Sequence, residues 1–202
     1  MMEQQEGGTF AYLGLPIQTE RLVIRCMARK DLEPLYKLNS DPEVMRYVGR
    51  GQPWTREFTE QIIGPIIANS NNHILDWVTI AEKKSNKFVG IVCLLRLPEI
   101  HRAQVGGGPY IEVGWRILWE HWNQGYATEA ATAVVDYGFK VRDLKELACI
   151  VDERNARSLR VVEKLGFQHM RTYSLNGQTI RFHWSDQQMF QARHERLKPR
   201  ST

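Results

Sequence analysis

The chain has little that would mark it as a membrane, secreted or zinc-binding protein. It contains three cysteines in 202 residues, and Cys26, Cys93 and Cys149 are too far apart to form a Cys-x-x-Cys pair. The histidines also lack the spacing of metal ligands, so no metal is expected. No apolar run approaches membrane-spanning length, and the first residues, MMEQQEGGTF, do not resemble a signal peptide. The expectation is a cytoplasmic protein with no membrane partner.

The positive charge of the chain is small and unevenly placed. The net charge is +4. Four basic residues lie in the last eleven positions, ARHERLKPRST, which we interpret as a frayed tail. Nucleic acid is therefore not expected as a partner, and a salt-sensitive RNA contact through this tail is kept only as an alternative. We predict an N-terminal extension at 1–16, one domain at 17–190 and a basic tail at 191–202.

Hydrophobic periodicity predicts a mixed sheet with helices on both faces. The expected elements are strand 19–27, helix 28–41, a helical turn at 42–48, helix 55–72, a strand hairpin across 76–97, strand 110–118, helix 127–141, strand 146–153, helix 155–167 and a second hairpin across 169–190. Gly64-Pro65 should kink or break its helix, and Gly166 should end another. Asn176-Gly177 is a strong hairpin turn. The order favours an α/β sandwich whose strands 110–118 and 146–153 are parallel neighbours in a right-handed crossover.

The segment WNQGYATEAATAVV is unusual for a helix start. A loop that leads into a helix presents unpaired backbone N–H groups and the positive end of the helix dipole, which together can bind phosphate. Gly125 allows a ligand to approach the backbone closely. We therefore expect a pyrophosphate on the amides of residues 123–128, although a plain helix start with Gly125 in a turn accounts for the same letters.

Two further features favour a ligand beside this loop. Gly114 lies in the middle of strand IEVGW, where glycine is costly unless it marks a bulge or a close backbone approach. A bulge would splay this strand from its parallel neighbour ACIVD. Asn155 follows that neighbour, where its amide can donate and accept. A phosphate site, an opened strand pair and a polar amide suit coenzyme A, which joins a pyrophosphate to a pantetheine with two amides.

The sequence resembles the GNAT acetyltransferase superfamily, and within it the RimJ/RimL-like branch. The matching segments include TERLVIR, IEVGWRI, WNQGYATEAATAVVDYGF and NARSLRVVEKLGF, and the resemblance spans nearly the whole chain. It implies a GNAT-like, mostly antiparallel mixed sheet with a splayed parallel strand pair, and acetyl-CoA as acyl donor. It also implies pantetheine pairing by one strand, a loop around the pyrophosphate and a contact from the asparagine. With the amides above, the expected cofactor-binding residues are Trp115, Arg116, Ile117, Trp122, Asn123, Gln124, Gly125, Tyr126, Ala127, Thr128 and Asn155.

The sequence departs from the superfamily pattern at two positions. Trp122 stands where Gln or Arg is frequent, as is common in this branch. Val162 stands where the superfamily usually has a tyrosine that acts as general acid, which puts the identity of the acid in doubt.

Acyl transfer to an amine needs a base with a pKa near the working pH. Glu112 is our candidate, because its apolar surroundings should raise its pKa. A solvated Glu112 on an exposed face is the simpler alternative, and Asp152 and Glu153 are weaker rivals. Ser158 is the leading candidate for the acid. Tyr126 is another, although packing roles explain both residues more simply.

The expected activity is N-acetylation of a primary amine, on a protein N-terminus or a small molecule, by direct attack in a ternary complex. Two alternatives stay open: a CoA-binding regulatory module without turnover, and a transferase of a larger acyl group. Tyr47, Trp54, Trp77 or His101 could contact the acceptor. Glu129 is expected to complement the helix dipole or to bind a nearby strand. The sequence does not choose between monomer and homodimer.

Overall fold

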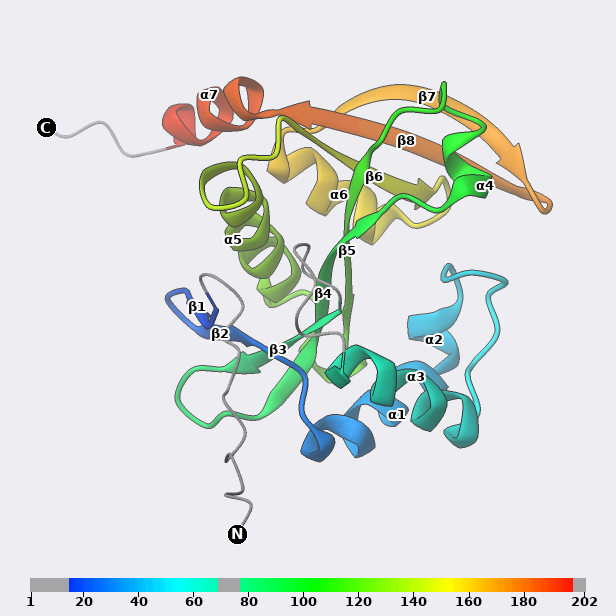
Figure 1. The fold of residues 1–202 in the computed structure, drawn as a ribbon, viewed down its shortest axis with the longest axis vertical. Helices are drawn as coiled ribbons and strands as arrows, with labels where there is room; N and C mark the ends of the chain where they lie inside the picture. Colours follow the sequence, from blue (N-terminus) through cyan, green and yellow to red (C-terminus); the bar gives the residue numbers. More distant parts are fainter. Residues whose placement is uncertain (1–14, 69–76, 198–202) are drawn as a thin grey trace, which may run out of the picture.

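The structure, a computed structural model, describes residues 15–68 and 77–197. In these residues the strands form one eight-stranded sheet with the order β1-β2-β3-β4-β5-β6-β8-β7 (Figure 1). The strands are β1 Ile17–Gln18, β2 Leu22–Arg25, β3 Val78–Glu82, β4 Phe88–Arg96, β5 Ile111–Ile117, β6 Glu146–Asp152, β7 Gln168–Leu175 and β8 Gln178–Asp186. Every neighbouring pair is antiparallel except β5 and β6, which are parallel. The predicted mixed, mostly antiparallel sheet is confirmed.

Helices cover both faces of this sheet (Figure 1). They are the 3-10 helices η1 Arg29–Asp31 and η2 Trp119–His121, and α1 Leu32–Ser40, α2 Pro42–Met45, α3 Arg56–Ala68, α4 Glu99–Arg102, α5 Tyr126–Lys140, α6 Ala156–Leu165 and α7 Gln187–Leu197. The main core lies between the sheet and helices α5, α6 and α7. A second core joins α1, α2 and α3 to the other face at β4. None of the described helices is long and apolar enough to cross a bilayer.

The turn chemistry of the chain agrees with its sequence at two positions. Asn176 and Gly177 both have positive φ, 50° and 77°, and they join β7 to β8 in the predicted hairpin. Gly166 adopts the left-handed conformation, with a φ of 81°, directly after α6. Both conformations are ones that residues with a bulkier side chain adopt only at a cost, which is why the sequence signal was reliable.

Two expectations about the helices were wrong, and a third was wrong in part. Gly64-Pro65 was expected to kink or break its helix, but it does not break α3, which continues through Pro65 to Ala68; the predicted residues 69–72 lie outside the described part. The loop after β4 contains the short helix α4. The last strand ends at Asp186, and residues 187–197 form α7 instead of a strand end followed by a frayed tail. Phe190 lies in the main core, and its burial explains why this segment is ordered as a helix.

A buried carboxylate fixes α1 against the edge of the sheet. Asp31, at the end of η1, accepts hydrogen bonds from Arg25 Nη1 and Nη2, both at 2.8 Å, and from Ala28 N at 2.9 Å. Thr79 Oγ1 on β3 donates to the same carboxylate at 3.0 Å. Burial opposes the charged form, but these donors together hold the pKa of Asp31 below its usual value. The network therefore ties β2, β3 and the α1–α2 unit together.

The first prediction concerns this network. Replacing Asp31 by alanine leaves the partly buried Arg25 without its ion-pair partner, and such a loss costs about 3–5 kcal/mol of the free energy of unfolding. Urea denaturation of both proteins at pH 7 measures the difference. Glu33→Ala is the matched control, because Glu33 pairs with Arg56 on the exposed surface, where solvent screens the pair, and its loss should change stability far less than the loss of Asp31. Equal losses in the two variants would contradict the assignment.

Candidate functional site

The parallel strands β5 and β6 separate soon after they meet. Within the described residues they share one paired position, Glu112 with Ala148. Beyond it the strands diverge, and a cavity of about 200 Å³ lies between them, lined by β5 and β6 and by residues after α2. The expected splay is therefore present, and it leaves the ends of both strands open to a ligand.

The expected reason for the splay was wrong. Gly114 does not form a bulge, because the β4–β5 register is unbroken from Gly90 opposite Ile117 to Arg96 opposite Ile111. Gly114 instead allows close packing. A Cβ atom at this position would lie 3.2 Å from Cys93 Sγ and 3.6 Å from the Trp77 ring. The glycine thus leaves room for Cys93 and Trp77 to pack closely against β5, and close approach was the other explanation that the sequence allowed for a strand glycine.

A second cavity of about 290 Å³ adjoins the first at the N-terminus of α5. Gly125 precedes α5 with a φ of 82° and offers no side-chain cap, so the N–H groups of the first turn are not capped by it. Twelve of the thirteen predicted site residues line one or both cavities: Glu112, Trp115, Arg116, Ile117, Trp122, Asn123, Gly125, Tyr126, Ala127, Thr128, Asn155 and Ser158. The structure therefore brings together residues from β5, the α5 loop and α6.

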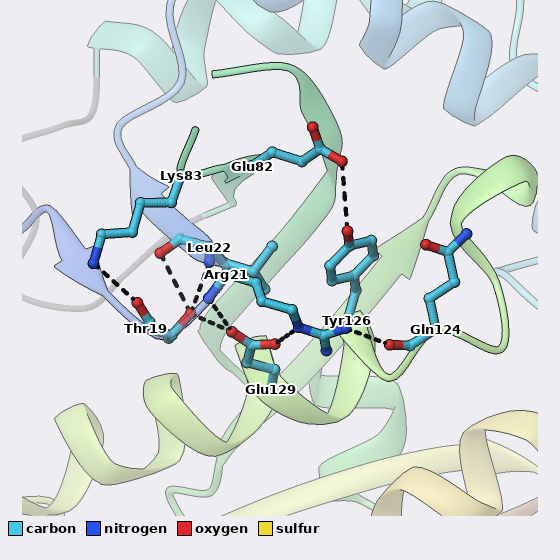
Figure 2. Close-up of polar contacts among 8 residues, drawn as sticks. All are labelled: Thr19, Arg21, Leu22, Glu82, Lys83, Gln124, Tyr126 and Glu129. Carbon is cyan, nitrogen blue, oxygen red and sulfur yellow. Dashed lines mark hydrogen bonds and ion pairs between the residues drawn. The ribbon is translucent and has the colours of Figure 1, made fainter. Parts of the chain in front are cut away.

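Gln124 differs from the other predicted residues because it serves to anchor the loop. Its carbonyl accepts a hydrogen bond from Arg21 Nη1 at 2.8 Å, and its side-chain Nε2 donates to Glu120 O at 2.9 Å. Figure 2 shows that the side chain of Arg21, the residue directly before β2, extends to this carbonyl. Gln124 is not among the residues that line either cavity.

The anchor continues into the first turn of α5 (Figure 2). Glu129 accepts hydrogen bonds from Thr19 Oγ1 at 2.6 Å, Arg21 N at 2.9 Å and Arg21 Nε at 2.7 Å. Of the two expected roles, complementing the helix dipole or binding a nearby strand, the structure supports a form of the second, because Glu129 binds the turn that joins β1 to β2. Tyr126 packs under Arg21, whose Cζ lies 4.6 Å from the ring centroid, and its hydroxyl donates to Glu82 at 3.4 Å. Because Glu82 engages this hydroxyl, packing explains Tyr126 better than proton donation does.

Basic side chains surround the larger cavity. Arg157, Arg160 and Lys164 of α6 line it, and Arg157 Cζ lies 4.7 Å from the centroid of the Trp122 ring. Glu43 is an acid on this lining, and it forms an ion pair with Arg46. Positive side chains beside the uncapped helix start give this cavity the charge that a phosphorylated ligand requires.

Asn155 has a local structural role that the sequence reading did not separate from ligand contact. Its Oδ1 accepts from Ser158 N at 3.1 Å and so caps α6. The acceptor atom is therefore engaged, and the Nδ2 group is what it can offer to a ligand. Asn155 and Ser158 each line both cavities. Val162, at the position where the resemblance implies that the superfamily usually has a tyrosine, is buried at 1% exposure and carries no acidic proton.

Glu112 is the best candidate base in the structure. It lines the smaller cavity, and burial raises its pKa to about 7. Asp152 lines the same cavity but pairs with Arg154, and this hydrogen bonding lowers its pKa below the usual value. Glu153 pairs with Arg181 on the surface and is not among the cavity-lining residues. Of the two carboxyl groups that line this cavity, the Glu112 carboxyl is therefore the one whose pKa suits general-base work at neutral pH.

The side chain of Arg116 has a setting that the sequence reading missed. Its guanidinium lies between the rings of Trp54 and Trp77, with Cζ 4.9 and 4.6 Å from their centroids. Nη1 donates to Asn39 Oδ1 at 2.5 Å. Burial lowers the pKa of Arg116 to about 10, so the group is still charged at pH 7. The expectation for this residue concerned its backbone alone, and periodicity gave no signal for a buried cation.

Of the aromatic and histidine residues expected to contact the acceptor, some line a cavity and others do not. Tyr47 and Trp77 line the smaller cavity, whereas Trp54 packs on Arg116. His101 does not line either cavity; its Nδ1 lies 2.7 Å from Tyr173 Oη. No group of three His, Cys, Asp or Glu side chains that could hold a metal occurs in the described ranges.

Comparisons with known proteins agree with this architecture. A family model described as an acetyltransferase (GNAT) domain matches residues 21–168. The chain is 31% identical to the uncharacterized protein YkkB of Bacillus subtilis, over 76% of this chain and 86% of that protein. It is 30% identical to a spermidine N(1)-acetyltransferase of Escherichia coli K12, over 77% of this chain and 79% of that protein.

A solved structure gives the same result. A GNAT-family acetyltransferase from Bacillus anthracis superposes with a TM-score of 0.72 at 26% identity, covering 85% of this chain and 98% of that one. The chain therefore belongs to the GNAT acetyltransferase family and is an acyl-CoA-dependent N-acetyltransferase.

Proposed function

We propose that the protein transfers the acetyl group of acetyl-CoA to a primary amine by direct attack in a ternary complex. The observation that carries this proposal is the continuity of the two cavities. They share Trp115, Arg116, Asn155 and Ser158, so one ligand can extend from the α5 loop into the splay beside Glu112. The segments quoted above favour the RimJ/RimL-like branch. A small molecule with an amine is favoured over a protein N-terminus as the acceptor, because relatives named for a small amine, spermidine, are similar over most of the chain.

In the proposed complex, acetyl-CoA follows this continuous cleft. Its pyrophosphate would lie on the N–H groups of residues 123–128, with the basic side chains of α6 nearby. The pantetheine would pair with the backbone of residues 115–117, which faces the widened gap. Asn155 would contribute its Nδ2 donor. The thioester then lies in the smaller cavity beside Glu112.

Glu112 is proposed to take the proton of the attacking amine. A free alkylamine is mostly ammonium at pH 7, and it attacks the thioester carbonyl only after losing a proton. A carboxyl group with a pKa of about 7 can accept that proton directly or through a water. The nitrogen forms its bond to the carbonyl carbon, and the carbon–sulfur bond then breaks. Ser158 is the proposed donor to the leaving thiolate, since it lines both cavities, and the second proton that the amine nitrogen loses as it becomes an amide replaces the one that Ser158 gives up.

Two alternatives make different claims about the same cleft. A CoA-binding regulatory module would bind the cofactor without turnover, and the valine at position 162 is its main support. A transferase of a larger acyl group would need more room beside Glu112 than acetyl requires. Turnover assays with acetyl-CoA and succinyl-CoA on one amine separate these alternatives from the proposed reaction.

The second prediction tests the base. Glu112→Gln should lower kcat by about two orders of magnitude or more, which is the usual contribution of a general base. In the wild type, the plot of log kcat/KM against pH should break near pH 7, with the base active above that pH because only the carboxylate accepts a proton. The break should vanish in the variant, while the dissociation constant for acetyl-CoA stays within about threefold.

At high pH, Glu112→Gln should have a larger free energy of unfolding than the wild type. The folded state favours protonated Glu112, so it loses stability as the pH rises through about 7. A shift from 4.5 to about 7 corresponds to about 3 kcal/mol, and Glu112→Gln should recover up to that amount at pH 8.5 but little at pH 4. If the plot of log kcat/KM against pH kept its break near pH 7 in the glutamine variant, Glu112 would be eliminated as the base.

The third prediction tests the loop anchor. Arg21→Ala removes the contacts to Gln124 and Glu129, and the looser loop should bind acetyl-CoA on the order of tenfold more weakly. Because Arg21 is not among the residues that line the smaller cavity beside Glu112, kcat at saturating cofactor should change by less than about threefold. Calorimetry and steady-state kinetics measure the two quantities. Arg56→Ala is the matched control, since Arg56 pairs with exposed acids away from the cleft. Unchanged affinity in Arg21→Ala would refute the anchoring role.

A further inference from the structure

We propose that Arg154 sets the acceptor specificity: by neutralising Asp152 in the acceptor cavity, it makes the enzyme select amines with a single positive charge over diamines and polyamines. This inference rests on the acetyl transfer proposed above. It concerns the class of amine that the cavity beside Glu112 accepts, which neither the family nor the cofactor site determines.

Asp152 is the residue whose charge is at issue. It ends β6, is 4% exposed and lines the smaller cavity. Arg154 donates to both of its carboxylate oxygens. Its Nε lies 3.0 Å from Oδ1, its Nη2 lies 2.7 Å from Oδ2, and its backbone N lies 2.9 Å from Oδ1. The carboxylate is therefore fully engaged by one cation, and it offers little net negative charge to the cavity.

The other charges on this cavity do not favour a second ammonium group. Among the described residues that line this cavity, Glu112 and Asp152 are the acidic side chains and Arg116 is the basic one. Glu112 is needed for the proton of the reacting amine. Arg116 is a buried cation with no described carboxylate partner. A polyamine would bring a second positive charge toward Arg116 without meeting a free carboxylate, and burying such an unpaired charge is costly.

The uncharged lining suits an amine with an apolar body. Tyr47 and Trp77 line this cavity together with valine and isoleucine side chains. Arg154 also packs on this wall, with Cζ 5.7 Å from the Tyr47 ring centroid. Its side chain is 64% exposed, so its charge can be removed without disturbing a core. A single exposed side chain therefore controls whether Asp152 is available to a substrate.

The closing experiment compares amines that differ by one charge. The kcat/KM values of butylamine, its diamine analogue putrescine, and spermidine are measured with acetyl-CoA for the full chain. The wild type should prefer butylamine. Arg154→Gln leaves Asp152 uncompensated, and it should raise the putrescine-to-butylamine ratio on the order of tenfold. Adding Asp152→Asn to that variant should reverse the gain, because the freed carboxylate is then gone.

A matched control separates this effect from a general change in surface charge. Arg181 forms an ion pair at 3.2 Å with Glu153, the residue that follows Asp152 in the sequence. The Arg181 side chain is 40% exposed, and Arg181 is not among the residues that line the cavity. Arg181→Gln should leave the ratio unchanged. A wild type that acetylates putrescine as efficiently as butylamine, or an Arg154→Gln ratio equal to that of the wild type, would overturn the specificity proposal alone. If no amine were acetylated although CoA still raised the melting temperature, acetyl transfer itself would be refuted, and the specificity proposal with it.

Discussion

The early separation of β5 from β6 is the constraint on which the rest of the structure depends. β5 and β6 pair at one position, so the rest of their facing backbone groups are not joined by sheet hydrogen bonds. The gap between the strands must therefore be lined by side chains and loops from elsewhere. The α5 loop lies at one end of the gap and Glu112 at the other. Of the proposed contacts with acetyl-CoA, those made by residues 115–117 use backbone groups that a regular sheet would have paired with β6. The proposed active cleft is in this sense the part of the sheet in which β5 and β6 are not paired.

Two buried ionisable groups on β5 indicate that stability was traded for function there. Burial disfavours the charged forms of both Glu112 and Arg116, raising one pKa and lowering the other. Asp31 shows the contrast, because its donors more than offset the effect of burial. Structural carboxylates in this protein are thus surrounded by donors, whereas the proposed catalytic carboxylate is held in apolar surroundings. That difference gives a physical criterion for separating the two kinds of acid.

Local signals in the sequence were sufficient for much of the fold and the outline of the site. Asn176-Gly177 and Gly166 are predictable because few residues tolerate positive φ. The bulge at Gly114 was wrong because a strand glycine has two explanations, and only the position of Cys93 and Trp77 decides between them. Helix α7 was missed because its stability comes from the burial of Phe190 in a distant core. The Arg154 pairing with Asp152 was missed although the residues are two positions apart, because the sequence does not show that the Asp152 carboxylate is buried and needs a partner.

The anchor between Arg21 and Glu129 joins positions that are 108 residues apart in the chain. The proposed phosphate loop is consequently completed by a strand that is synthesised long before the loop itself, and the loop reaches its final form only after that strand has docked. A division of the chain between β2 and β3 would place Arg21 and Glu129 on separate polypeptides. Each piece alone would lack half of the anchor, so recovery of cofactor binding after mixing would report directly on the reassembly of the fold.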